Sequence, residues 1–394
     1  MERDYTVKEM ETRKIEVVIV GAGPSGLATA ACLKVHGIPN VVLEREECCA
    51  SLWKLRAYDR LKLHLAKRFC WLPHAPFPDD APTFIPKDQF VRYVDDYTER
   101  FAIDPVLSTT VEHAAYDKAS GAWSVIARSS STDKLTDYRC RFLVVATGEN
   151  SEGFVPDIPG LKQFPGRAIH SSFFKSGRDY AGKNVLVVGS GNSGMEIAYD
   201  LSNHGAKTTI VIRSPLHVMT KEMIYWGMVL LKYLPVTVVD TLALLLAKFK
   251  FGDLSKYGIV RPSMGPFKIK LATGTSAVID VGTIGKIQTG EIKVVKAVEK
   301  INGDEVVFAD GKKYNYDAIV FATGFKSTAK TWLEDDEVLL DKEGMPNERV
   351  PNHWKGKNGI YCVGFARAGL AGVSMDAKNV ADDIKNRIKK LSKI

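Results

Sequence analysis

Short apolar runs recur along the chain, and several of them end directly at a glycine. The runs at 15–20 and 184–188 lead into clusters of three glycines, and stretches with helical periodicity follow at 27–34 and 195–203. Continuous apolar runs of this length are typical of buried parallel strands, and strands that alternate with helices indicate βαβ units. The pattern therefore predicts an α/β protein with two Rossmann-like, three-layer domains.

The same periodicities place further elements. Strands are expected at 41–43, 61–65, 123–127, 141–145, 208–212, 292–295, 305–308, 318–322 and 360–364, and helices at 87–101 and 374–390. Around 123–127 the strands alternate apolar and polar residues, which indicates an antiparallel excursion of three strands.

The two glycine clusters match G-x-G-x-x-G, the fingerprint of dinucleotide-binding folds. The first fingerprint comprises Gly21, Ala22, Gly23, Pro24, Ser25 and Gly26, and the second comprises Gly189, Ser190, Gly191, Asn192, Ser193 and Gly194. The first glycine permits a tight turn, the second lets the backbone approach a pyrophosphate, and the third lets the helix pack on the strand. The helix N-terminus then faces the phosphates. Two such sites predict two dinucleotides, and the simplest chemistry that needs both is electron transfer from a nicotinamide to a flavin.

Residues of opposite charge follow the two fingerprints. Glu44 ends a strand 18 residues after Gly26, where a carboxylate binds ribose hydroxyls and repels a 2′-phosphate. Arg213, followed by Ser214, ends a strand 19 residues after Gly194, where a guanidinium binds a 2′-phosphate. We therefore expect FAD or NAD at the first site and NADPH at the second, and the flavin chemistry favours FAD. A solvated strand end is the alternative for both side chains.

A strand ending in Ala-Thr-Gly occurs twice, at 146–148 and 322–324, and the interval between the copies contains the second fingerprint. This arrangement predicts one nucleotide-binding domain inserted into another. The expected boundaries are 1–168 for the first part of the FAD domain, 169–325 for the NADPH domain and 326–394 for the last part of the FAD domain. Thr147, in the first copy, is a candidate FAD contact.

Residues 51–74 are dense in aromatic and basic side chains. Trp53 is a candidate wall of the flavin site. Arg56, Arg60 and Lys62 are candidates to face phosphates or a substrate carboxylate, and Lys221, further along the chain, is a fourth candidate for the carboxylate. A surface loop with one buried tryptophan is the alternative.

Composition narrows the class of protein. Hydrophobic residues make up 45% and charged residues 25%, which is ordinary for a globular chain. The net charge of +8 suits an anionic ligand, a membrane surface or nucleic acid, but no basic cluster is interleaved with aromatic residues, so nucleic-acid binding is not expected. The six cysteines form no C-x-x-C pair, which argues against a disulfide reductase and favours a reduced, intracellular protein. No metal site is expected.

Two segments bear on localisation. Residues 1–14 lack the apolar segment of a signal peptide, so a cytoplasmic protein is expected, with the cytosolic face of the endoplasmic reticulum as the alternative. Residues 223–250 are the most apolar stretch, yet Lys232, Pro235 and Asp240 interrupt it before either half reaches the about 20 residues of a membrane span. Buried core or a lid over the substrate is favoured, ahead of peripheral membrane contact.

Residues 164–174 match F-x-G-x-x-x-H-x-x-x-[FY] and lie between the two fingerprints. This stretch resembles the identifying motif of class B flavin-containing monooxygenases, and 51–67, 185–201, 252–262 and 278–282 are similar in wording to the plant YUCCA branch. The resemblance implies an FAD- and NADPH-dependent monooxygenase that converts indole-3-pyruvate, an aromatic 2-oxo acid, to indole-3-acetate (auxin). The oxygen would come from O₂ through a flavin C4a-peroxide, with loss of CO₂ and without a protein nucleophile.

The resemblance also implies a role for Asn150, which follows the first Ala-Thr-Gly and would orient flavin and nicotinamide. His170 is expected to anchor the crossover between domains. Leu63 and His64 stand where animal members often have Thr-Asn, so the amine and thioether substrates of those enzymes do not carry over. The alternatives are a Baeyer–Villiger or N-/S-oxygenating monooxygenase with another acceptor, and a catalytically silent FAD-binding scaffold.

Overall fold

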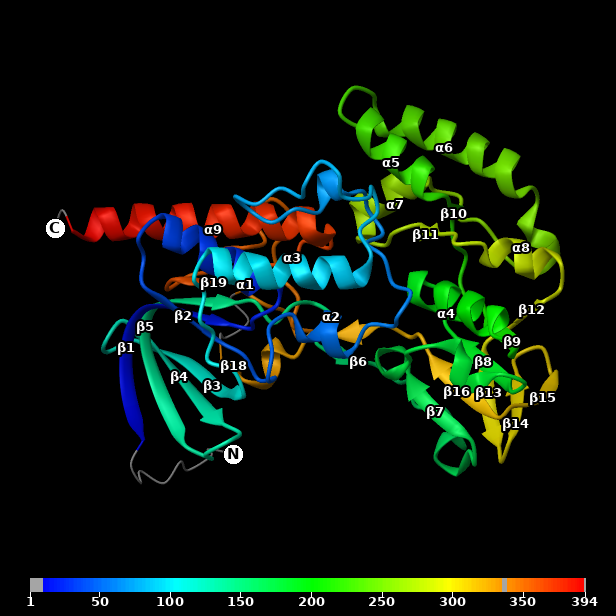
Figure 1. The fold of residues 1–394 in the computed structure, drawn as a ribbon, viewed down its shortest axis with the longest axis horizontal. Helices are drawn as coiled ribbons and strands as arrows, with labels where there is room; N and C mark the ends of the chain where they lie inside the picture. The colour runs from blue at the N-terminus through cyan, green and yellow to red at the C-terminus, as the bar shows by residue number, and fades with distance from the viewer. Residues whose placement is uncertain (1–9, 335–338, 393–394) are drawn as a thin grey trace. The chain divides into compact units, whose positions relative to one another are not determined.

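Two sheets, one mixed and one parallel, organise the computed structural model, which describes residues 10–334 and 339–392 (Figure 1). Contacts within the chain divide it into two units. The first unit comprises the chain up to Leu55, Lys67–Glu152 and the chain from Phe325 onward, and the second comprises Arg56–Ala66 and Gly153–Gly324. The predicted α/β class with parallel-sheet cores is confirmed.

The elements of the first unit are β1 (Glu11–Val20), α1 (Pro24–Val35), β2 (Asn40–Leu43), α2 (Ser51–Leu55), α3 (Lys87–Arg100), β3 (Thr109–Asp117), β4 (Ala122–Ser129), β5 (Leu135–Val145), β18 (Leu333–Glu334), β19 (Ile360–Cys362) and α9 (Gly369–Leu391). Strands β1 and β5 share a long parallel ladder, which β2 extends on one side and β19 on the other. The N-terminal part of β5 instead pairs antiparallel with β4, and β4 with β3. The predicted three-stranded antiparallel excursion is therefore confirmed.

Helix α1 packs closely because its buried positions are mostly small residues. Ala28, Ala30 and Ala31 are fully buried, and α1 lies beside α9 (Figure 1). Both helices begin earlier than the sequence pattern predicts, α1 at Pro24 and α9 at Gly369. Proline is well suited to the first helical position, where its missing N–H would in any case lack an intrahelical acceptor.

The elements of the second unit are β7 (Arg167–His170), β8 (Asn184–Val188), α4 (Asn192–Asn203), β9 (Lys207–Val211), β10 (Val218–Met219), α5 (Lys221–Leu230), α6 (Val236–Phe251), α7 (Pro266–Thr273), β11 (Val278–Ile279), α8 (Thr283–Gln288), β12 (Ile292–Val295), β13 (Val298–Asn302), β14 (Glu305–Phe308), β15 (Lys313–Asn315) and β16 (Ala318–Phe321). Five of the strands form a parallel sheet in the order β12-β9-β8-β16-β7. Strands β13, β14 and β15 form a separate antiparallel sheet before the chain enters β16. At the borders of the units, β6 (Glu152–Gly153) pairs with β17 (Phe325–Lys326).

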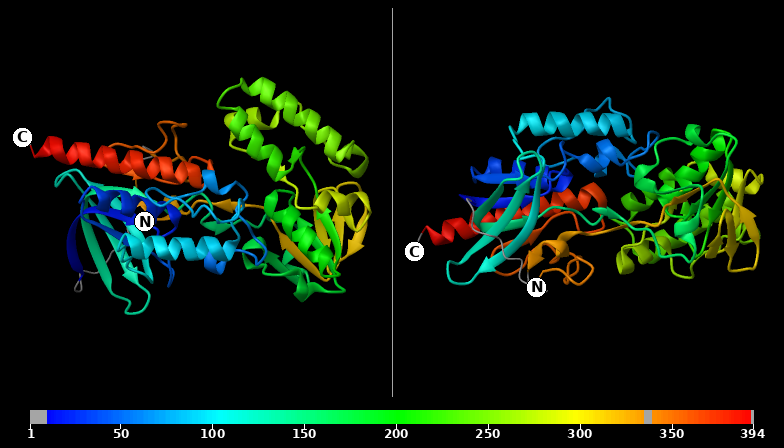
Figure 2. Two further views of the ribbon diagram at one scale, coloured as in Figure 1. Left: turned by 45° about the horizontal axis from the view of Figure 1, so that its top comes forward. Right: turned by 90° about the horizontal axis from the view of Figure 1, so that it is seen from below.

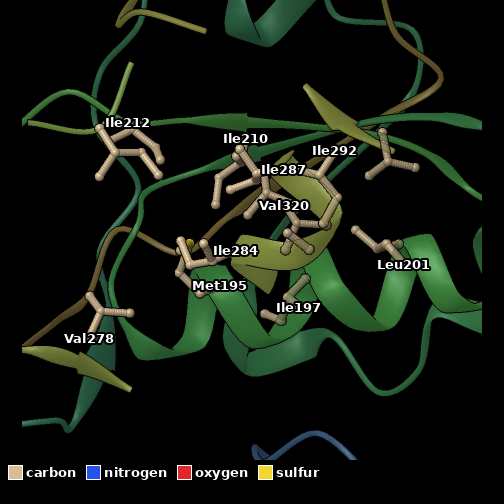
Figure 3. Close-up of a cluster of buried hydrophobic side chains, with 14 of the residues drawn as sticks. Met195, Ile197, Leu201, Ile210, Ile212, Val278, Ile284, Ile287, Ile292 and Val320 are labelled. Carbon is tan, nitrogen blue, oxygen red and sulfur yellow. The ribbon is translucent and has the colours of Figure 1, made fainter. Parts of the chain in front are cut away.

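Apolar side chains of α4 fix this helix on the sheet of the second unit. Met195, Ile197 and Leu201 are fully buried and belong to one apolar cluster with Ile210 of β9 and Val320 of β16 (Figure 3). Burial of each such side chain contributes on the order of 1.5–3 kcal/mol. The start of α4, which carries the second fingerprint, is thereby held at the carboxyl ends of β8 and β16.

The strand predicted at 61–65 is wrong. Residues 56–66, all within the described part of the chain, form no strand and belong to the second unit. The backbone N–H of Asp59 donates to the carbonyl of Lys175 at 3.0 Å, and Lys175 Nζ donates to the carbonyl of Ala57 at 3.1 Å. Hydrogen bonds to a residue more than 100 positions away therefore hold this segment in place. The alternation of apolar and polar residues does not reveal such contacts.

The apolar stretch at 223–250 forms a helical hairpin of α5 and α6 (Figures 1 and 2). The interpretation as buried core is wrong for one face of α6, where Leu245, Leu246 and Phe249 are 61%, 54% and 93% exposed. No helix in the described ranges is long and apolar enough to cross a membrane.

Candidate dinucleotide-binding sites

The first and third glycines of the first fingerprint have no room for a side chain. Gly21 has φ of +108°, and a Cβ atom there would lie 2.7 Å from the carbonyl oxygen of Ala146. A Cβ atom on Gly26 would lie 1.8 Å from the carbonyl oxygen of Gly21. Around Gly23, by contrast, no atom of the described residues lies within 4 Å of such a Cβ. The middle glycine therefore borders open space, and a phosphate of a ligand needs such space to contact the protein backbone.

The second fingerprint repeats this geometry. Gly189 has φ of +114°, and its Cβ would lie 2.4 Å from the carbonyl oxygen of Ala322. A Cβ on Gly194 would lie 2.0 Å from the carbonyl oxygen of Gly189, whereas one on Gly191 would meet no described atom within 4 Å. In both units the alanine of an Ala-Thr-Gly stretch therefore packs against the first glycine of a fingerprint. This contact explains why the two motifs occur together, twice, in the sequence.

The helices that follow the fingerprints leave their first amides available. Gly23 and Gly191 are the N-caps of α1 and α4, and neither helix has a side-chain cap or an acidic residue in its first turn. The first backbone N–H groups of a helix lack intrahelical acceptors, and the helix dipole makes this end positive. Both sites are therefore suited to an anionic group such as a pyrophosphate.

Glu44 is held against the first fingerprint. Its side chain is buried, Oε2 accepts a hydrogen bond from the backbone N–H of Ala22 at 2.7 Å, and Oε1 accepts one from the N–H of Glu46 at 3.0 Å. Burial raises the pKa of Glu44, and these two hydrogen bonds act in the opposite direction. A carboxylate has about four acceptor positions, so two remain for ribose hydroxyls.

The remaining candidates of the first unit differ in their surroundings. Thr147 Oγ1 is buried and has no hydrogen-bond partner among the described residues. Trp53 lies on α2 and packs against Phe90 of α3, with ring centroids 4.5 Å apart. Asn150 is exposed. The backbone N–H of Ala50 donates to the carbonyl of Ala22 at 2.9 Å, which ties the start of α2 to the fingerprint loop.

Arg213 and Ser214 follow β9 and are both exposed. Within the described part of the chain, Arg213 makes no ion pair or hydrogen bond through its side chain, so its guanidinium is available for a ligand. The preceding residue, Ile212, lines a pocket of about 460 Å³ that is also lined by four lysines and one acid, which are Lys256, Lys293, Lys296, Lys312 and Asp310. Positive charge therefore predominates in this pocket.

Asn192 of the second fingerprint has a structural contact. Its Oδ1 accepts a hydrogen bond from the backbone N–H of Ile279 in β11 at 2.8 Å. This bond joins the start of α4 to a strand 87 positions away, a contact that sequence reasoning missed.

Sequence reasoning also missed Glu196, the acid in a polar cluster beside α4 that includes the predicted candidates Arg60, Lys62 and Lys221. Glu196 is buried in α4, and its Oε1 lies 3.2 Å from His64 Nε2. Burial lowers the pKa of Lys221, the charge of Glu196 raises it, and the charges of Lys62 and Arg60 lower it. The Arg60 guanidinium lies 4.5 Å from the ring centroid of Tyr199. The only local signal is a lone acid two positions after Gly194, in an otherwise small and apolar helix start.

His170 joins the ends of two chain segments of the second unit. Its Nε2 lies 2.9 Å from the carbonyl oxygen of Gly324, so it donates, while Nδ1 accepts from the backbone N–H of Ser172 at 3.2 Å. A Cβ on Gly153 would lie 2.3 Å from Nδ1. Burial lowers the pKa of His170, which favours the neutral imidazole that these contacts require. These contacts are those of a residue that holds the chain at Gly324 in place.

Comparisons with known proteins agree over most of the chain. The family model described as FMO-like, flavin-binding monooxygenase-like, matches residues 14–377. The probable indole-3-pyruvate monooxygenase YUCCA10 of Arabidopsis thaliana is 54% identical over 371 residues, which are 94% of this chain and 97% of that protein. The indole-3-pyruvate monooxygenase YUCCA1 of Oryza sativa subsp. japonica is 48% identical over 389 residues, which are 98% of this chain and 95% of that protein. A solved flavin-containing monooxygenase from Stenotrophomonas maltophilia shares the fold, with a TM-score of 0.71 at 19% identity over 96% of this chain and 100% of that one.

Proposed function

The chain belongs to the flavin-binding monooxygenase-like family, and on that premise we propose that it oxidises indole-3-pyruvate to indole-3-acetate with NADPH and O₂. The names of relatives about half identical over nearly the whole chain support this substrate. The observation that carries the proposal is the pair of fingerprints with opposite charges beside them, Glu44 in one unit and Arg213 in the other.

We propose that FAD binds in the first unit. The fit rests on the open space at Gly23, the uncapped start of α1, and the buried hydroxyl of Thr147, which has no partner among the described residues. Glu44 would bind the ribose through its two remaining acceptor positions. Ala22, Pro24 and Ser25 would form the rest of the phosphate loop, and Trp53 would close the site from α2.

We propose that NADPH binds in the second unit. Gly191 and the uncapped start of α4 would receive the pyrophosphate, with Ser190 and Ser193 supplying hydroxyl donors nearby. Arg213 and Ser214 would bind the 2′-phosphate, since the guanidinium has no partner among the described side chains. Asn192 would position the start of α4 instead of binding the nucleotide with its side chain, because its Oδ1 is hydrogen-bonded to β11.

The proposed reaction consumes indole-3-pyruvate, NADPH, a proton and O₂, and yields indole-3-acetate, CO₂, NADP⁺ and water. When bound, FAD supplies the redox chemistry, which no side chain of a protein can perform with O₂ in this way. The chain would bind and orient the two nucleotides, and we propose that Asn150 orients the flavin and nicotinamide. One oxygen atom enters the new carboxylate and the other leaves as water, while the bond between the carboxyl group and the keto carbon breaks.

Turnover of the purified protein tests the proposal. We expect indole-3-acetate, identified by mass, to form in a one-to-one ratio with NADPH consumed, and one ¹⁸O atom from labelled O₂ to appear in its carboxylate. NADPH consumption that yields only hydrogen peroxide would leave the family intact and refute the substrate. Oxygenation of a cyclic ketone, an amine or a thioether in place of the 2-oxo acid would instead establish a different acceptor.

A further inference from the structure

Helix α6 has two apolar faces. Its inner face is buried: Val239 and Ala243 lie in a small core shared with Phe267 of α7, and Phe251 lies in the larger core of the second unit. Its outer face is large, apolar and exposed. The members of this α6 outer face are Val238 (43% exposed), Leu242 (43%), Leu245 (61%), Leu246 (54%) and Phe249 (93%). Their spacing of three or four residues places them on one stripe along the helix.

Exposed apolar side chains also occur on the elements that contact α6. Trp226 on α5 is 60% exposed, Tyr233 after α5 is 79% exposed, and Leu271 on α7 is 73% exposed. In Figure 1 the hairpin of α5 and α6 lies at the edge of its unit, and Ala247 and Phe251 of α6 join the buried cluster that covers the parallel sheet. Large exposed apolar patches on globular proteins mark interaction sites, since water contact with them is unfavourable.

The same region is strongly basic. Residues 221–274 contain seven lysines, one arginine and three acids, a net charge of +5 out of +8 for the chain. One acid, Asp240, is buried and accepts hydrogen bonds from the backbone N–H groups of Phe267 and Lys268 at 2.8 and 3.1 Å. Lys248 and Lys250 are exposed on either side of Phe249. An apolar stripe with flanking lysines is complementary to a surface that has a negatively charged outer layer and an apolar layer beneath it.

We propose that the α6 outer face docks the protein on an anionic lipid bilayer, with the helix lying flat in the surface. A helix with apolar residues on one side and lysines beside them binds in this way, and its affinity rises with the negative charge of the lipid. Spanning is excluded, because α6 has 16 residues and a span needs about 20.

A second copy of the chain is a poorer occupant. A two-fold contact through α6 would bring the same patch of both copies together. Each patch lies in the segment 221–274 with its net charge of +5, so two positive segments would be brought together, and like charges at an interface oppose association. Anionic headgroups neutralise them instead.

Co-sedimentation with vesicles tests the proposal. We expect the wild-type protein to bind vesicles of phosphatidylcholine and phosphatidylserine, and to bind phosphatidylcholine alone more weakly. The variant carrying Leu245→Glu and Phe249→Glu should lose affinity by at least about tenfold. Replacing Lys248 and Lys250 with glutamine should lower binding to the anionic vesicles by roughly tenfold or more and weaken its dependence on salt. The control Val35→Glu changes a similarly exposed apolar residue (54%) on α1 and should bind as the wild type does.

Because the substituted side chains are exposed, all variants should keep the thermal midpoint and the NADPH oxidation rate of the wild type. Failure of the wild type to bind anionic vesicles, or equal binding by the α6 variant, would overturn the proposal. Light scattering provides the remaining outcome: a dimer in the wild type that becomes a monomer in the α6 variant would show that a second copy covers this face, and would overturn it as well.

Discussion

Replacing Arg213 with glutamine removes the charge that we assign to the 2′-phosphate of NADPH. The side chain is exposed at the end of β9 and has no ion-pair partner among the described residues, so the change disturbs no internal contact. NADH lacks the 2′-phosphate, so only the use of NADPH should suffer. Lys207→Gln is the matched control, because Lys207 is exposed at the opposite end of the same strand.

The exposure of Arg213 sets the magnitude of the effect. Two unit charges about 4 Å apart interact by about 1 kcal/mol in water, and a phosphate monoester carries roughly 1.5 to 2 negative charges near pH 7. Adding the hydrogen bonds of the guanidinium and subtracting the screening by salt leaves about 1.5–2.5 kcal/mol. This free energy corresponds to roughly a 10- to 60-fold loss in kcat/KM for NADPH.

Steady-state kinetics with both nucleotides measure this ratio. We expect Arg213→Gln to reduce kcat/KM for NADPH by that factor, chiefly through KM, and to leave the value for NADH within about twofold. Lys207→Gln should change neither value. An unchanged preference for NADPH in Arg213→Gln, or an equal loss with both nucleotides, would refute the assignment of the second site.

Three further changes follow from the geometry. Glu44→Ala leaves two backbone N–H groups without their acceptor, so it should lower the free energy of unfolding by about 1–3 kcal/mol. The variant should also retain less FAD on purification, and a full flavin content would count against the ribose contact. Gly194→Ala forces a Cβ against the carbonyl oxygen of Gly189 and should lower the thermal midpoint. Gly191→Ala should weaken NADPH binding without lowering the thermal midpoint. Equal midpoints of the two variants would contradict the packing argument. Burial lowers the pKa of His170, so the wild type should lose stability as the pH falls below about 6.5 and the imidazole becomes protonated. The thermal midpoint of His170→Gln should lack this part of the pH dependence, and an identical pH profile would contradict it.

The sequence predicted both fingerprint sites because their glycines are fixed by local geometry. Gly21 and Gly189 adopt positive φ, and Gly26 and Gly194 touch backbone that lies five residues earlier, so each motif carries its own reason. The resemblance to class B flavin-containing monooxygenases and the YUCCA branch is confirmed by the family model and the curated relatives.

The features that the sequence did not predict depend on contacts between residues that are distant in the chain. His64 contacts Glu196, which lies 132 positions later, and Asn192 accepts a hydrogen bond from Ile279, which lies 87 positions later. Nothing in the sequence around His64 or Asn192 predicts these partners. Hydropathy also fails for α6, because it reports that a residue is apolar and not whether another part of the chain covers it. The predicted boundaries at 168 and 325, the role of Asn150 and the placement of the two nucleotides stay predictions.

Anaerobic mixing of the purified yellow protein with NADPH tests most directly whether one chain holds both a flavin and its reductant. We predict that the absorbance of oxidised FAD disappears in a single turnover, faster with NADPH than with NADH, and returns when O₂ is admitted. A protein that retains FAD and is not reduced by NADPH, or one that retains no flavin after reconstitution, would contradict the two-nucleotide assignment and the oxygenase function that rests on it.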